Sequence, residues 1–137
     1  MEEKQIIELC RAFAKKADEL ETIAFKNINY KENSFTDEFN KLFNQYCFGK
    51  QNRTISGLNF GQPPRYDNLK FCTETNVESL SKTKYQVTFW AEPKFKTIRF
   101  ILDKRKSEWK LIRFETYLGI SNQEKTKGEE IWRKHKL

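Results

Sequence analysis

The feature that most restricts the fold is an alternation of apolar and polar side chains, with a period of two, in the second half of the chain. It runs through residues 84–91, 97–103 and 109–118, which are rich in β-branched and aromatic residues. This is the pattern of strands that bury one face. The polar segment 103–108, "DKRKSE", fits a tight turn between antiparallel strands. With a further strand predicted at 68–75, this half of the chain is predicted to form an antiparallel sheet.

The alternation also predicts which side chains share a face of the sheet. Trp90 alternates with Val87 and Phe89, so it is predicted to point to the opposite face. Both faces carry large apolar groups. One face is therefore expected to pack on helices, and the other to stay partly open as a concave surface. In the last strand, one face is predicted to hold Ile112, Phe114 and Leu118, and the other Trp109, Leu111, Arg113 and Tyr117.

Helical patterns come first in the chain. Residues 3–25 place apolar side chains at three- and four-residue steps, the spacing of one helix face. A second helix is predicted over residues 34–46, with Ser34 as its N-terminal cap. Residues 49–64 are predicted to be loop around one short strand. The tail, residues 121–137, has a cap-like serine but a glycine in its middle, so a short or broken helix is predicted there.

Length and composition favour one globular domain. The chain has 137 residues, of which 15% are aromatic, enough for one core. Helices followed by a curved antiparallel sheet make an α+β fold, with helices packed on a cone-like sheet, and residues 1–137 are predicted to form a single domain.

The cysteines and the absence of apolar runs favour a soluble, cytoplasmic protein. Cys10, Cys47 and Cys72 form no CxxC motif and have no companion histidines, so free buried thiols are predicted. No apolar run approaches the roughly 18 residues that span a bilayer. The N-terminus is acidic and amphipathic, unlike a secretory signal. We therefore predict no membrane association.

The net charge of +7 is concentrated in one part of the chain. Residues 94–113 contain eight Lys or Arg and two acids, whereas residues 1–50 contain eight bases and nine acids. A field concentrated in one hairpin would steer an acidic partner toward that side of the molecule.

Motifs that would indicate an enzyme are absent. The sequence contains no GxSxG, no HExxH and no glycine-rich phosphate loop. The single histidine, His135, lies two residues from the C-terminus and is predicted to be a solvated tail residue. We therefore predict a protein that is not an enzyme and that binds neither a metal ion nor a cofactor.

The basic hairpin could bind either nucleic acid or protein. Its bases could meet phosphates while a tryptophan stacks on a base, but no signature of a nucleic-acid-binding module is present. Tryptophan and arginine are also enriched at protein-interface hot spots, so Trp90, Trp109, Arg99 and Arg113 are predicted to form a protein-binding face. The full set of predicted partner-binding residues is Trp90, Lys94, Lys96, Arg99, Lys104, Arg105, Lys110 and Arg113.

The segment "TIRFILDKRKSEWKLIRFETY" resembles the last strand pair of the nuclear-transport-factor-2-like fold. Trp109 matches the recurrent tryptophan position of that superfamily, and Arg113 lies near its following basic position. The resemblance implies that Trp109 has a structural role rather than a direct contact with a partner. Together with "YQVTFW" and the basic ending "IWRKHKL", the layout is similar to that of immunity proteins of bacterial polymorphic toxin systems. The resemblance implies a protein that binds a cognate toxin domain and occludes its active site. The charge of the hairpin adds the expectation that the toxin has an acidic contact surface.

Two other classes of function stay open. A small-molecule enzyme or carrier of the isomerase or dehydratase type could use the same cone-shaped fold, with Tyr85, Tyr117, Asp67 and Glu115 as candidate site residues. A nucleic-acid-binding domain is the third and less favoured class. The sequence does not indicate the oligomeric state.

Overall fold

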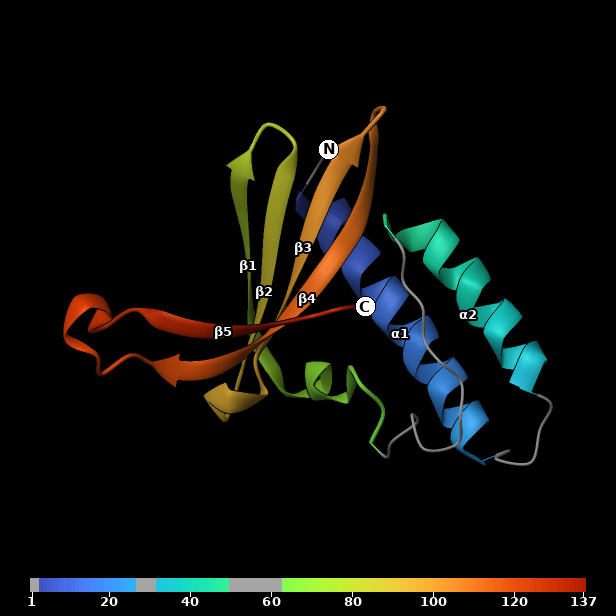
Figure 1. Cartoon of the computed structure of the whole chain (residues 1–137), viewed down its shortest axis with the longest axis horizontal. Coiled ribbons are helices and arrows are strands. Elements are labelled where there is room, and N and C mark those ends of the chain that lie inside the picture. The colour runs from blue at the N-terminus through green and yellow to red at the C-terminus, as the bar shows by residue number, and fades with distance from the viewer. Residues whose placement is uncertain (1–2, 27–31, 50–62) are drawn as a thin grey trace. The chain divides into compact units, whose positions relative to one another are not determined.

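The chain is built from two helices followed by a five-stranded antiparallel sheet (Figure 1). The structure is a computed structural model that describes residues 3–26, 32–49 and 63–137. Its contacts divide the chain into two compact units, one ending at Asp67 and the other beginning at Asn68. This order of elements confirms the predicted α+β class.

The first unit contains α1 (Glu3–Lys26) and α2 (Glu32–Tyr46). The ring of Phe13 meets the rings of Phe43 and Tyr46, with centroids 6.4 and 6.1 Å apart. Because α2 begins at Glu32, Ser34 lies inside the helix, and its predicted role as the N-terminal cap was wrong. Most of the predicted loop 49–64 lies outside the described residues. The buried stripe of α1 follows the predicted spacing and includes Ile6, Cys10, Phe13, Ala14 and Ala17.

The cysteines are free thiols, as predicted, but not all of them are buried. Cys10 and Cys47 are buried, whereas Cys72 is half-buried. Burial raises the pKa of the Cys10 thiol far above its ordinary range. A thiol that stays protonated is a poor nucleophile, so Cys10 fills the helix core as a small apolar side chain.

The second unit is a meander in which each strand pairs only with its neighbours in sequence. Its strands are β1 (Cys72–Ser81), β2 (Lys84–Ala91), β3 (Ile98–Arg105), β4 (Glu108–Ile120) and β5 (Glu130–His135). The central hairpin therefore lies where the alternation predicted it.

The first strand and the tail differ from their predictions. Asp67–Phe71 forms a 3-10 helix, and the strand predicted at 68–75 begins only at Cys72. In the described tail, the only helical segment is the short 3-10 helix Glu124–Thr126, and β5 follows it where the prediction allowed a further piece of helix. Gly128 has a φ of 88°, a conformation that suits glycine, and its N–H donates to the Ser121 carbonyl across the β4–β5 connection. Gly128 therefore belongs to a turn between strands.

Register assigns the faces of the sheet. Val87 lies opposite Phe100, and Phe100 lies opposite Phe114, so these buried side chains share one face. A shift in the β3–β4 register inserts Ile112 as an extra residue and brings Leu111 to the same face as Phe114. The predicted grouping of Trp109 and Leu111 with Arg113 and Tyr117 was therefore wrong.

The β3–β4 turn suggests a stabilising substitution. Lys106 and Ser107 have φ values of 52° and 66°, the positive values of a type I′ turn. Glycine adopts this conformation without the steric penalty of a Cβ atom. We expect Ser107→Gly to raise the free energy of unfolding by about 0.5–1 kcal/mol in urea titrations. Ser79→Gly, on the exposed strand β1, is the control and is expected to lower it. A loss of stability in Ser107→Gly would contradict this turn conformation.

Candidate functional site

The face of the sheet that carries Trp90 gathers aromatic rings and arginines. Register places Trp90 and Arg99 on this face, away from the side that holds Val87 and Phe100. The same alternation brings Glu115 opposite Arg99 and Trp132 opposite Tyr117. We call this surface the aromatic–arginine face; its members are Trp90, Arg99, Arg113, Glu115, Tyr117 and Trp132.

Three rings from three strands form a cluster on this face. The centroids of Trp90 and Tyr117 are 5.6 Å apart, those of Trp90 and Trp132 5.8 Å, and those of Tyr117 and Trp132 5.2 Å. All three pairs meet edge to face, an arrangement that aromatic quadrupoles favour. On a flat sheet, β2 and β5 would be separated by roughly 14 Å. Rings that meet across these strands therefore lean together where the sheet curls toward this face, a curvature visible in Figure 1.

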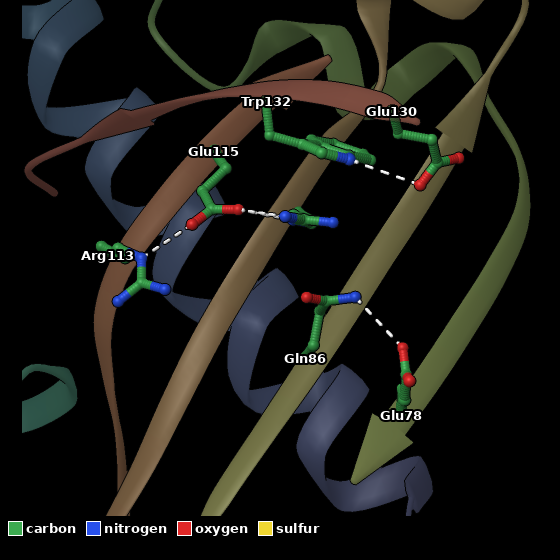
Figure 2. A network of polar contacts seen from close by, with 7 residues as sticks. Glu78, Gln86, Arg113, Glu115, Glu130 and Trp132 are labelled. Atoms are coloured by element: carbon green, nitrogen blue, oxygen red, sulfur yellow. Dashed lines mark hydrogen bonds and ion pairs between the residues drawn. The ribbon is translucent and has the colours of Figure 1, made fainter. Parts of the chain in front are cut away.

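Glu115 holds both arginines of the face, and Figure 2 shows its contact with Arg113. Its Oε1 accepts from Nε of Arg99 at 2.6 Å, with Nη2 of Arg99 also 2.6 Å away, and its Oε2 accepts from Nε of Arg113 at 2.7 Å. The carboxylate is buried, with the whole residue 1% exposed. The guanidinium of Arg99 also lies 3.8 Å from the ring centroid of Trp132, which is a cation–π contact. The ion pairs and the aromatic cluster are therefore one connected network.

The two arginines determine the protonation state of Glu115. Burial alone would raise the pKa of this carboxyl group, but the hydrogen bonds from Arg113 and Arg99 outweigh burial and lower it. Glu115 is therefore ionised at neutral pH and is a weak proton acceptor. A general base works best with a pKa near the operating pH, so this network is better suited to positioning charges than to transferring protons.

The lowered pKa of Glu115 gives an expected pH dependence. Since the unfolded chain binds a proton at this site more readily, acidification favours unfolding. The contribution of Glu115 is fully present above the ordinary pKa of a glutamate, near 4.3, and is lost as the pH falls through the lower folded value. We expect denaturation measurements below pH 5 to show a steeper loss of stability in the natural chain than in Glu115→Gln. Equal slopes would contradict this assignment.

Three of the predicted partner-binding residues come together, and the others are dispersed. Trp90, Arg99 and Arg113 belong to the aromatic–arginine face. Lys110 and Arg105 lie on the same side by register but near the β3–β4 turn, where they pair with Glu108 at 3.6 Å and Asp103 at 3.2 Å.

The remaining predicted lysines lie elsewhere in the second unit. The Nζ of Lys104 is 5.8 Å from the ring of Trp109 and points to the opposite face of the sheet. Lys94 and Lys96 lie in a 3-10 turn between β2 and β3, at the other end of β3 from Lys104. The Nζ of Lys96 lies 3.7 Å from the ring of Phe71. The eight Lys and Arg residues of segment 94–113 therefore do not form one continuous patch.

The prediction that Trp109 joins the other face residues was wrong. Its ring packs against Tyr85, with centroids 4.7 Å apart, on the face that also carries Phe100. Trp132 takes part in the cluster instead. Trp132 was not predicted on this face because the tail was predicted to be helical, although "IWRKH" alternates with a period of two.

The environment of the single histidine, His135, also differs from the prediction. The Nε2 of His135 lies 2.8 Å from Oγ1 of Thr116, and its ring stacks on Phe114 with centroids 4.7 Å apart. His135 therefore anchors β5 to β4 and is not a solvated tail residue.

The candidate residues for a small-molecule site do not form one constellation. Tyr117 and Glu115 share the aromatic–arginine face, but Tyr85 lies on the opposite face of the sheet. Asp67 belongs to the first unit, where it lines a recess beside Asp18 of α1. Within the residues that the structure describes, no group of three or more His, Cys, Asp or Glu side chains could hold a metal ion.

Two further findings bear on the class of protein. In the described part of the chain, no helix has both the length and the apolar character needed to cross a membrane. Comparisons with models of known protein families, with curated proteins and with solved structures found no match.

Proposed function

We propose that this chain is a cytoplasmic immunity protein that binds a cognate bacterial toxin domain and occludes its active site. The observation that carries this proposal is the aromatic–arginine face. Tryptophan, tyrosine and arginine are the residues most enriched at the hot spots of protein interfaces. Here the rings and guanidinium groups hold one another in place, so binding would immobilise few additional side chains.

The charge of the chain supports an acidic partner. Residues 94–113 carry six more bases than acids, and their lysines lie at both ends of the β3 strand. Such a distribution attracts an acidic surface over a broad area. The affinity for the toxin domain is expected to fall as salt is raised from low to high concentration. An affinity that does not change with salt would contradict electrostatic steering by this segment.

A small-molecule enzyme has weaker support. The buried carboxylate of Glu115 is neutralised by two guanidinium groups, and its lowered pKa makes it a poor base. A nucleic-acid-binding domain is also less supported. Glu74 and Glu78 of β1 lie on the same face as Trp90 and Gln86, so the described residues of this face lack the continuous basic track that follows a phosphate backbone.

The proposal is tested by using the tagged chain as bait in a lysate of its source cells. Bound proteins are identified by mass spectrometry and then expressed with and without the chain. Recovery of a toxin-like domain whose growth inhibition is relieved by the chain is the expected result. Recovery of no such protein, together with growth inhibition that the chain never relieves, would refute the proposal and leave a ligand screen as the next experiment.

A further inference from the structure

The two arginines of the aromatic–arginine face are held differently. Arg99 points both Nε and Nη2 at one oxygen of Glu115 and stacks on Trp132, and its side chain is 17% exposed. Arg113 uses Nε alone, at 2.7 Å from the other oxygen, and its side chain is 32% exposed. Arg99 is therefore held on several sides, whereas Arg113 is fixed at one edge of its guanidinium group.

The terminal nitrogens of Arg113 are available for a ligand. Figure 2 shows both Nη atoms on the side of the guanidinium group that points away from Glu115. Among the described side chains, no buried nitrogen or oxygen lacks a partner. These Nη groups, for which the described residues supply no acceptor, are therefore reached by solvent. An arginine held by Nε presents its two Nη groups as a flat fork, which matches the two oxygens of a carboxylate.

We propose that the Nη fork of Arg113 binds a carboxylate of the partner protein, from an aspartate or glutamate side chain, as an anchor of the interface. This inference rests on the proposed function and names the chemical group that the face recognises. Glu115 acts as a positioning residue, because its bond to Nε fixes the plane and direction of the fork. Arg99, which stacks on the ring of Trp132, in turn holds Glu115 from the other side.

A carboxylate fits this site better than the phosphates of a nucleic acid. One carboxylate shared by two guanidinium groups leaves a single excess positive charge, which one monovalent anion balances. Three further carboxylates belong to the same face: Glu74 and Glu78 by register, and Glu130 through its bond from Nε1 of Trp132 at 3.4 Å. A chain of phosphates laid across this face would meet these acids, whereas one side chain directed at Arg113 would not.

The experiment follows the Nε–Hε resonances of the arginines by NMR in the full-length chain. The probe is N-acetyl-glutamate amide, which has one side-chain carboxylate, and the control probe is N-acetyl-glutamine amide, its uncharged isostere. We expect a saturable shift at Arg113 with an apparent Kd on the order of 10 mM and a smaller shift at Arg99. The glutamine probe is expected to cause no saturable shift.

Two variants separate the shape of the fork from its charge. Arg113→Lys keeps the charge but removes the fork. Binding of the glutamate probe to this variant, followed through the smaller shift of the Arg99 Nε–Hε resonance, is expected to weaken about tenfold. Lys134→Gln, opposite Glu115 on β5, removes a charge and keeps the fork, so binding is expected to change less than about twofold. Thermal melting of both variants checks that they are folded, and the comparison of the two probes on the natural chain requires no variant.

Several results would overturn the inference. These are equal shifts with both probes, a shift at Arg113 that does not saturate, or saturation at lower concentration by inorganic phosphate or a single-stranded oligonucleotide. Failure here is distinguishable from failure of the proposed function. If the chain relieves toxicity but binds no glutamate probe, only the carboxylate anchor is wrong. If the probe binds and no toxin is recovered, the anion site stands and the immunity function fails.

Discussion

Replacing Glu115 with glutamine is expected to lower the free energy of unfolding by about 3 kcal/mol, because the change leaves two guanidinium groups without their counter-ion. Arg99 and Arg113 both point at this carboxylate from within 2.7 Å, and the residue is 1% exposed. The amide has the same shape but accepts only through one oxygen. Two positive charges would then face each other with no anion between them at the buried position 115.

The measurement is urea unfolding of both chains at neutral pH. Glu108→Gln is the matched control. The exposed Glu108 carboxylate lies 3.6 Å from Nζ of Lys110, so this change also removes one negative charge from an ion pair. An ion pair with an exposed carboxylate contributes at most about 1 kcal/mol, so the control is expected to stay within about 0.5 kcal/mol of the natural chain. Equal, small losses in both variants would show that the Glu115 network contributes little to stability.

The sequence predicts the central hairpin well because its alternation leaves few alternatives. β2 and β3 have aromatic or branched aliphatic residues at every second position, and a one-residue shift would expose all of them. The prediction fails in β4, where Leu111 and Ile112 are consecutive apolar residues. A bulge absorbs one of them, and a simple period of two cannot show which residue is the extra one. The face assigned to Trp109 and Leu111 was wrong for this reason.

The candidate site was predicted only in part, because its key contacts join distant segments. Summing charge over residues 94–113 leaves out Glu115, the acid that pairs with two of the arginines in that range and balances one of their charges. Trp132 reaches the face only because the last strand pairs with β4 at Tyr117. Pairing of this kind depends on the register across a turn. In the sequence, Gly128 is compatible with a break in a helix as well as with a turn between strands. Local patterns therefore predict the strands, whereas the aromatic cluster can be predicted only once the pairing of β4 with β5 is known.

Replacing Trp90 with alanine is expected to weaken binding of the cognate toxin domain by about 30-fold or more, whereas the same change at Trp109 is expected to leave the affinity within about threefold. The two tryptophans are a matched pair, since each is half-buried and each packs against other rings. They differ in the face of the sheet on which they lie. Trp90 belongs to the aromatic cluster with Tyr117 and Trp132. Trp109 packs on Tyr85, and both lie on the opposite face of the sheet.

Stability alone does not separate these variants. Loss of a large ring that packs on its neighbours lowers the free energy of unfolding by about 3 kcal/mol in either case. The affinity is therefore measured by calorimetry at a temperature where melting curves show both variants to be folded. A comparable loss of affinity in both would mean that binding tracks the stability of the sheet. A loss confined to Trp109→Ala would move the interface to the opposite face. A loss confined to Trp90→Ala means that the toxin contacts the face held together by Glu115.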